Sequence, residues 1–477
     1  MTESARIKKN TLYSLLSISS RLVANVIVFW MIARIYGPDI FGTFTFAHTT
    51  STLLILLGDF GFDLLLTTEI SKARENATNI FQSIFSLKIL FALTAFLLMW
   101  IVSFVGNHSP ETQFALRIFS FFTLFTTLTN FSLALIKGFE KFSLESIVSL
   151  IMNVSLVIII PVLTYAKVHI LIIAAAFVIT RLFGLIFSIY FNKKILPQIS
   201  FKIKFPKEKE LHKKVMIFGI NLLFTNLFFQ LDTILISFLK GNTAVGLYQA
   251  VFKLIILPLM IPDIMNFALL PVLTRLFVSD KEKALKLSYL MNKTLFLLSL
   301  PITLILFLFA SDIITLIYGG KLFADSIPVL KIFAFNIFVR FAFETFALML
   351  TTTDKQIIRM YTVVAATFVN LSLNIILIPQ LGITGAAMVS LITIILVYFI
   401  YTVYSFKLYL QWFIKKEMIL MFTIFLLTGL LISYLKVPML YGIPIIAIVF
   451  GSTGYYYFEV SERSLLFSDF IMIRKRN

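Results

Sequence analysis

Fourteen runs of roughly 20 or more mostly apolar residues follow one another along this chain of 477 residues. A helix needs about 20 such residues to cross the hydrocarbon core of a bilayer. The composition agrees, because 59% of the residues are hydrophobic and only 13% are charged, against about 45–50% and about 25% in soluble domains. A soluble enzyme, a nucleic-acid-binding protein and a disordered chain are therefore excluded, and the sequence predicts an all-α polytopic membrane protein.

The apolar runs give the expected spans. They cover residues 12–34, 41–66, 80–105, 114–136, 145–165, 170–191, 215–239, 245–271, 288–317, 328–352, 356–378, 382–405, 417–435 and 438–458. The first run is too long for a signal peptide, carries Arg21 and lacks a small-residue cleavage site, so we expect it to stay as a helix. Without cysteine, disulfides and thiol chemistry are excluded. The four histidines have no ligand-like spacing, so we expect no metal site.

Lysine and arginine are distributed unevenly between the two sides of the predicted membrane. With the N-terminus in the cytoplasm, and with Arg34 and Arg359 counted with the loops that they border, 28 of the 41 basic residues lie in cytoplasmic segments, five in outer loops and eight inside spans. Cytoplasmic loops of membrane proteins are enriched in these residues. We therefore predict that both termini are cytoplasmic. The same placement argues against a nucleic-acid partner, despite a net charge of +18.

A short motif occurs twice in the chain. Gly37, Gly42 and Phe44 form the pattern G-x4-G-x-aromatic, which recurs 204 residues later as Gly241, Gly246 and Tyr248, and the same offset relates Asp59 to Asp263. Six expected helices separate the copies, so both keep the same direction through the membrane. This predicts two parallel six-helix lobes. Glycine at these hairpins allows a tight turn and a close helix approach.

The repeat suggests an order of domains. We expect an N-lobe at 1–191, a basic cytoplasmic linker at 192–214, a C-lobe at 215–405, and two further helices with a basic tail at 406–477. The expected outer loops are about ten residues long or shorter. An O-antigen polymerase or a membrane glycosyltransferase needs a sizeable outer loop or an acidic catalytic motif. Neither is present, so we expect a transporter without catalytic residues.

Charged residues inside the spans carry the functional interpretation. A charge at mid-bilayer costs at least about 2.5–3.5 kcal/mol on insertion scales, so retained charges indicate a functional site. We predict a water-filled cationic cavity between the lobes. The expected substrate-binding residues are Arg21, Arg117, Arg181, Lys253, Lys293 and Arg340, and the expected coupling or counter-charge residues are Asp59, Asp232, Asp263 and Glu344.

Each embedded charge also has a structural explanation. Arg340 and Glu344 are four residues apart on a helix and can neutralise each other. Asp59 and Asp263 can brace helix ends. Basic residues near an interface can extend to the water, an explanation that applies to Lys88, Arg117, Lys293 and Lys331. Arg21, Arg181 and Lys253 are the hardest to explain in this way.

Several segments of the chain form a set with a characteristic order and spacing. In the first half they are Ala33–Pro38, Phe41-Gly42 and Gly58–Gly61. In the second half they are Val245–Tyr248, Lys253-Leu254, Leu270-Pro271 and Ile378–Ala387. Together they resemble the first hairpin, its second-half counterpart and the turn before helix twelve of the Wzx-type O-antigen and polysaccharide flippases of the MOP exporter superfamily. The resemblance covers nearly the whole chain and implies a V-shaped, MATE-like fold with two additional C-terminal helices.

The resemblance also implies a function. Such a flippase moves undecaprenyl-pyrophosphate-linked oligosaccharide repeat units, of O-antigen or capsular type, from the cytoplasmic to the periplasmic leaflet of the bacterial inner membrane by alternating access. In the related lipid II flippases, basic residues on helices one and eight line the cavity, and Arg21 and Lys253 lie on those helices here. A polysaccharide polymerase and a chain-length regulator are the protein partners that this resemblance implies. It implies no cofactor.

The driving force and the substrate have alternatives. A pyrophosphate diester carries about two negative charges, so the membrane potential alone could drive its export. Coupling to H+ or Na+ through Asp59, Asp232 or Glu344 is the alternative. A multidrug exporter on the same fold would need acids to bind organic cations, whereas the six predicted substrate-binding bases outnumber the four predicted counter-charge acids here. A lipid II flippase remains a second alternative.

Overall fold

The computed structural model of the chain describes residues 3–105, 108–199, 201, 219, 230–413, 415–459 and 462. Nearly all of these residues are helical, and no strand occurs among them. They divide into two compact units, the first containing Met1–Lys253 and Asn374–Ile383, the second Leu254–Leu373 and Thr384–Asn477. Eleven helices of the described part are long and apolar enough to cross a membrane. The prediction of an all-α, multi-pass membrane protein is confirmed.

Two of these helices each contain two expected spans that meet at a glycine. Helix α1 (Glu3–Asp59) bends at Gly37, which has a φ of 75°. Helix α12 (Gln356–Phe413) bends at Gly382, which has a φ of 60°. Glycine adopts positive φ without the steric cost that a Cβ atom brings. The expected span 215–239 lies mostly outside the described residues, which include only 219 and 230–239 of it.

Two expected spans, 41–66 and 288–317, are interrupted. Helix α1 ends within the expected span 41–66, and α2 (Phe62–Lys72) begins after Phe60 and Gly61, whose φ angles are 31° and 77°. The expected span 288–317 is divided into α9 (Lys281–Leu308) and α10 (Ala310–Tyr318). Apolar composition over a window of about 20 residues does not reveal a break of one or two residues, so hydropathy alone could not locate either interruption.

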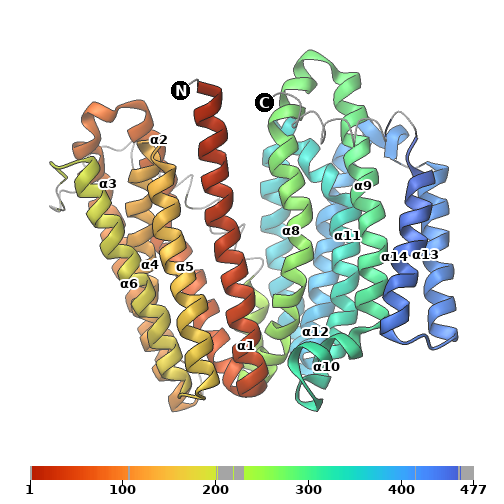
Figure 1. Ribbon diagram of the computed structural model, residues 1–477, viewed down its shortest axis with the longest axis horizontal. Helices are drawn as coiled ribbons and strands as arrows, with labels where there is room; N and C mark the ends of the chain where they lie inside the picture. The colour runs from red at the N-terminus through yellow and green to blue at the C-terminus, as the bar shows by residue number, and fades with distance from the viewer. Residues whose placement is uncertain are drawn as a thin grey trace. The chain divides into compact units, whose positions relative to one another are not determined.

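In the first unit, α4 (Pro110–Gly138) packs against α1, α3 (Ala77–Phe104) and α6 (Ile170–Ile195), while α5 (Phe142–Tyr165) packs against α1 and α6 (Figure 1). A 3₁₀ turn, η1 (Arg74–Asn76), joins α2 to α3. The Ser109 side chain caps α4 by accepting a hydrogen bond from the amide of Thr112, as N-cap serines do. Phe62, Phe81 and Phe131 lie in the buried core of this unit.

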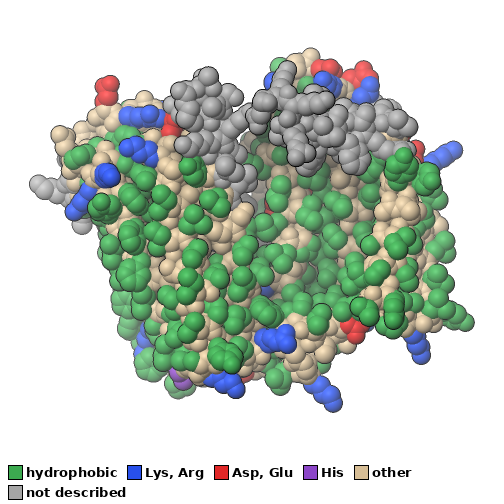
Figure 2. Space-filling view, viewed as in Figure 1, with side chains coloured by type: hydrophobic (Ala, Val, Ile, Leu, Met, Phe, Trp, Pro, Cys, Tyr) green, Lys and Arg blue, Asp and Glu red, His purple; other side chains and the backbone are tan. Residues whose placement is uncertain are grey.

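Helix α8 (Asn242–Ser279) begins in the first unit and continues into the second. There, α9 packs against α11 (Ile327–Thr352), α13 (Lys416–Tyr434) and α14 (Met439–Tyr457), with η2 (Lys321–Ser326) preceding α11. Figure 2 shows hydrophobic side chains over the sides of the helices of each unit, with most visible Lys and Arg near the helix ends. This distribution is the one expected of helices that lie in lipid.

Candidate functional site

The two copies of the repeated motif pack against each other within the first unit. A Cβ atom built on Gly42 would overlap the carbonyl oxygen of Asn242, and one built on Gly246 would overlap the carbonyl oxygen of Pro38. Asn242 holds the position in the second copy that Pro38 holds in the first. The contact is therefore reciprocal, and both glycines are needed because a backbone carbonyl occupies the space of their side chain.

Glycine has a second role at the start of each copy. Gly37 and Gly241 have φ angles of 75° and 81°, a region that residues with a Cβ rarely adopt. The sequence pattern thus separates into one glycine that permits the turn and one that permits the close approach.

Polar side chains add hydrogen bonds to this contact. The Thr243 hydroxyl donates to Asp39 Oδ1 at 2.9 Å, and these two residues are again related by the 204-residue offset. The Asn242 amide donates to the hydroxyls of Thr43, at 2.9 Å, and Thr112, at 2.6 Å. The motif predicted from glycines is therefore a hydrogen-bonded joint between two hairpins.

Two of the predicted substrate-binding cations each lie over an aromatic ring that packs near His48. Lys253 Nζ is 4.1 Å from the ring centre of Phe29, which is 5.0 Å from the ring centre of His48. The Arg181 guanidinium carbon is 5.2 Å from the ring centre of Phe122, which is 5.6 Å from that of His48. Helices α1, α4, α6 and the start of α8 contribute these residues, so the packing of the first unit brings the cations together.

These cations have no acidic partner in the described part of the chain. Arg21, Arg181 and Lys253 form no ion pair with any described carboxylate. Arg181 Nε is buried without a hydrogen-bond partner, and the positive charge of Arg21 acts on Arg181. Buried charge without a partner is unfavourable, so the arrangement favours an anionic ligand.

His108 lies beside the hairpin joint rather than beside the cations. Its ring centre is 5.0 Å from that of Phe46 and 5.1 Å from that of Phe238. Burial among these rings lowers the pKa of His108 below its ordinary value of about 6.5. The side chain is therefore neutral at neutral pH and adds no positive charge to the site.

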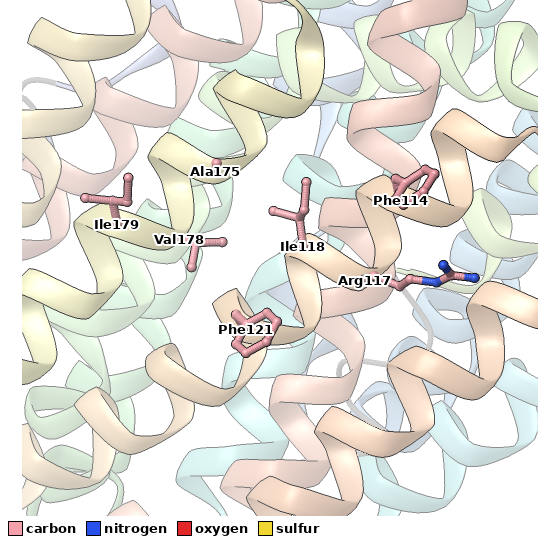
Figure 3. A pocket seen from close by; sticks show the side chains of 7 residues that line it. All are labelled: Phe114, Arg117, Ile118, Phe121, Ala175, Val178 and Ile179. Carbon is pink, nitrogen blue, oxygen red and sulfur yellow. The ribbon is translucent and has the colours of Figure 1, made fainter.

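Arg117 is separate from these cations. Its guanidinium carbon lies 5.5, 4.7 and 5.4 Å from the ring centres of Trp100, Phe104 and Phe114, contacts that stabilise a cation in apolar surroundings. Arg117 also borders an apolar groove between α4 and α6, and its guanidinium points away from the other lining side chains (Figure 3). The lining residues are Phe114, Arg117, Ile118, Phe121, Ala175, Val178 and Ile179.

Asp59 belongs to a buried ion cluster. Lys88, whose side chain is 0% exposed, places its Nζ 2.7 Å from Asp59 Oδ1 and 2.9 Å from Asp63 Oδ1. Asn130 donates to Asp59 Oδ2 at 3.0 Å. The expectation that Lys88 extends to the interface is corrected here, because its ammonium is bound inside the first unit by two carboxylates flanking the break between α1 and α2.

Removing the base of this cluster is expected to destabilise the protein. Lys88→Met would leave two buried carboxylates without their cation, a change that typically costs about 3–5 kcal/mol. We expect a clearly lower melting temperature for the purified protein in detergent. Lys72→Met is the matched control, since the Lys72 side chain is 65% exposed. Equal melting temperatures for the two variants would contradict a stabilising role for Lys88.

Arg340, Asp263 and Glu344 meet in the second unit. Arg340 Nη2 lies 2.5 Å from Asp263 Oδ1, and Arg340 Nε lies 3.6 Å from Glu344 Oε2. Asn266 donates to Glu344 Oε1 at 2.6 Å, and the Tyr398 hydroxyl donates to Oε2. The ion pair between Arg340 and Glu344 that their spacing suggested is therefore present, and Asp263 forms a second ion pair with Arg340.

Lys293 is also partnered within the second unit. Its Nζ lies 2.7 Å from Glu462 Oε2, and its side chain is 2% exposed. The same Nζ is 4.7 and 5.3 Å from the ring centres of Tyr457 and Phe458. This cation is therefore neutralised by a carboxylate and surrounded by aromatic rings.

Asp232 lies in the first unit as a buried hydrogen-bond acceptor. Its carboxylate accepts from the Tyr248 hydroxyl at 2.6 Å and from the Asn374 amide at 2.8 Å. Tyr248 is the aromatic residue of the second motif copy. The aromatic residue of the second motif copy thus donates a hydrogen bond to Asp232, one of the predicted counter-charge residues.

Sequence reasoning missed His48 and Asp63. His48 was not considered further because the histidines lack ligand-like spacing. A polar residue inside an apolar span can nevertheless itself indicate a functional site. Asp63 lies four residues after Asp59, but only the helix break shows that both acids bind one lysine.

Sequence comparison relates the chain to polysaccharide biosynthesis proteins. The family described as "Polysaccharide biosynthesis protein" matches residues 7–277, and the MatE family matches residues 218–376. A proposed O-antigen transporter of Escherichia coli (strain K12) is 25% identical over 160 residues, which cover 33% of this chain and 38% of that protein. The matched part therefore spans well under half of that relative.

Solved structures share the fold. The lipid II flippase MurJ in an inward closed conformation has a TM-score of 0.70 at 17% identity, covering 97% of this chain and 100% of that chain. An inward-facing multidrug resistance MATE transporter of the MOP superfamily has a TM-score of 0.67 at 12% identity, covering 82% of this chain and 97% of that chain. The predicted MATE-like fold is confirmed.

Proposed function

The chain belongs to the family of polysaccharide biosynthesis proteins and has the fold of MOP-superfamily transporters, and on this premise we propose that it is a lipid-linked oligosaccharide flippase. Its substrate would be an undecaprenyl-pyrophosphate-linked repeat unit of O-antigen or capsular type. Transport would run by alternating access from the cytoplasmic to the periplasmic leaflet of a bacterial inner membrane. The observation that carries the proposal is the group of cations near His48 that have no acidic partner among the residues that the structure describes.

The chemistry of these cations suits a pyrophosphate. Arg181 offers a planar guanidinium that can donate two parallel hydrogen bonds to phosphate oxygens, while Lys253 offers a compact point charge. Arg21 adds a further positive charge near Arg181. A group with about two negative charges would balance them, while the polyprenyl tail stays in lipid.

The direction of transport follows from the charge of the substrate. Moving one elementary charge across 100 mV is worth about 2.3 kcal/mol, so two negative charges moving outward gain roughly 4.6 kcal/mol when the inside is negative. The excess of basic residues on one side supports cytoplasmic termini. The membrane potential would therefore favour export.

Two other substrates fit the same fold. The MurJ neighbour transports lipid II, which also carries a pyrophosphate, so the cations around His48 suit that substrate as well. The MATE neighbour is a multidrug transporter. A cationic drug would be repelled by Lys253 and Arg181, for which the described part of the chain supplies no acidic partner. An anionic lipid-linked substrate is therefore favoured over an organic cation. A polymerase and a chain-length regulator as partners stay predictions.

Deleting the gene in its host tests the proposal. We expect surface polysaccharide to be lost and lipid-linked repeat units to accumulate on the cytoplasmic side of the membrane, because the substrate can no longer cross. Expression of the wild-type chain should restore both. Unchanged surface polysaccharide would contradict the proposal. Accumulation of lipid II would instead indicate the peptidoglycan precursor, and drug hypersensitivity alone would indicate a multidrug exporter.

A further inference from the structure

Arg117 lies near one end of a membrane-spanning helix of the first unit. It follows Pro110, the first residue of α4, by seven residues, so its Cα lies roughly 10 Å along the axis from this helix end. Since α4 has 29 residues, it is longer than the hydrocarbon core of about 30 Å. Arg117 is therefore close to one boundary of the core, where its side chain can reach the lipid phosphates. The predicted topology makes this the outer boundary.

Three aromatic rings fix the guanidinium of Arg117. Its carbon lies 5.5, 4.7 and 5.4 Å from the ring centres of Trp100, Phe104 and Phe114. Trp100 is itself held in place, because its indole N–H donates to the hydroxyl of Ser120 at 3.1 Å. The Ser120 side chain lies in the buried interior. Ring faces attract a cation without neutralising it, so the rings orient the guanidinium and leave its charge.

The guanidinium has no counter-charge in the described part of the chain. None of the described carboxylates forms an ion pair with Arg117, and the hydrogen bond that these residues supply runs from Nε to Ser103 Oγ at 3.4 Å. Its four other N–H groups, on Nη1 and Nη2, have no acceptor among the described residues. Such a fork can donate two parallel hydrogen bonds to one phosphate. The open end of Arg117 therefore suits a phosphate group.

An apolar groove begins beside this cation, between α4 and α6 (Figure 3). Its volume is about 260 Å³, which is below the range of about 300–1,000 Å³ typical of pockets for drug-sized ligands. All lining side chains except that of Arg117 are apolar. Phe121 and Ile179, which line it, are 42% and 47% exposed, so the groove opens towards lipid. One acyl chain suits such a groove.

The membrane supplies a ligand that combines these two features. A phospholipid places its phosphate at the boundary of the core and its acyl chains within the core. One guanidinium balances one net negative charge, which is the charge of phosphatidylglycerol. A zwitterionic phospholipid adds an ammonium group that Arg117 would repel. Cardiolipin carries a second phosphate, for which the groove and the three rings offer no second base.

We infer that Arg117 and the groove between α4 and α6 form a binding site for phosphatidylglycerol of the outer leaflet. The phosphate lies on the guanidinium, and one acyl chain lies in the groove. The inference does not rest on the proposed function, because the rings that hold Arg117 are different from those beside Lys253 and Arg181. The bound lipid is a ligand in addition to the transported substrate.

Brominated phospholipids test the site, because bromine on an acyl chain quenches the fluorescence of a neighbouring tryptophan. The chain has three tryptophans, and Trp30→Phe with Trp412→Phe leaves Trp100, beside Arg117. This full-length reporter is reconstituted in phosphatidylcholine vesicles that contain either brominated phosphatidylglycerol or brominated phosphatidylcholine. We expect phosphatidylglycerol to bind about fivefold more tightly at Trp100, the ratio that one basic group supplies towards an anionic lipid. High salt should lower this ratio.

Three substitutions in the reporter separate the parts of the site. Arg117→Gln should lower the preference for phosphatidylglycerol to about one, because the cation is lost. Lys331→Gln is the matched control, since Lys331 is an exposed base 5.6 Å from the ring centre of Phe307 in the second unit. It should keep the fivefold preference. Ala175→Phe fills the groove and should weaken binding of phosphatidylglycerol. The melting temperature of each variant checks its folding.

Equal quenching by the two brominated lipids in the reporter overturns the inference, and this result does not depend on whether Arg117→Gln folds. An unchanged preference in folded Arg117→Gln, or unchanged binding in folded Ala175→Phe, also overturns it. Unlabelled competitors test the choice of lipid. Cardiolipin or undecaprenyl phosphate that displaces the brominated lipid better than phosphatidylglycerol does would assign the site to that competitor instead. The gene deletion test is separate from these outcomes, since it bears on the proposed function alone.

Discussion

Arg181→Ala and Lys253→Ala are each expected to reduce transport of lipid-linked oligosaccharide by roughly 30-fold or more, which corresponds to about 2 kcal/mol of lost interaction with a charged group. Both side chains lie beside His48 without an acidic partner in the described residues, so each would contact the pyrophosphate directly. The measurement is translocation in proteoliposomes at a fixed membrane potential. Lys253→Arg should retain much of the activity because it retains the charge.

The control for this pair is Lys321→Ala. Lys321 is an exposed base of η2, and we expect its removal to leave transport unchanged. Binding of farnesyl pyrophosphate, compared with neutral farnesol, gives a second readout that does not require translocation. If Arg181→Ala and Lys253→Ala bind and transport like the wild type at equal membrane levels, the cations around His48 do not hold the substrate.

Gly42→Ala and Gly246→Ala are expected to destabilise the folded protein by about 1–3 kcal/mol each, because the added methyl group would overlap a backbone carbonyl rather than a flexible side chain. Overpacking of this kind forces the backbone of the hairpin joint to shift. The melting temperature of the purified protein in one detergent measures the effect.

Gly451→Ala is the matched control for these substitutions. Gly451 lies within α14, and a Cβ atom built on it meets nothing within 4 Å. Alanine is favoured over glycine inside a helix by up to about 1 kcal/mol, so this variant should be as stable as the wild type or slightly more stable. A hairpin variant that melts like Gly451→Ala would refute the close packing of the two motif copies.

The sequence by itself determined the class of the fold. An apolar run of about 20 residues can only satisfy its backbone hydrogen bonds in lipid as a helix, so composition was sufficient to predict the multi-pass architecture. The offset of 204 residues between the two glycine motifs could also be recognised from the sequence alone. Both are properties of local composition and spacing, and the structure confirmed the helices and placed the two motif copies in contact.

Only the tertiary structure decided which embedded charges have partners. Lys88 and Arg340 each bind two carboxylates, and Lys293 binds Glu462. Lys253 and Arg181 instead lie over the aromatic rings of Phe29 and Phe122, and neither has an acidic partner among the described residues. Most of these partners are distant in the sequence, so hydropathy and spacing along one helix could not rank the charges. The physical reason is that the free energy of a buried charge depends on atoms within a few ångströms, and helix packing brings those atoms together.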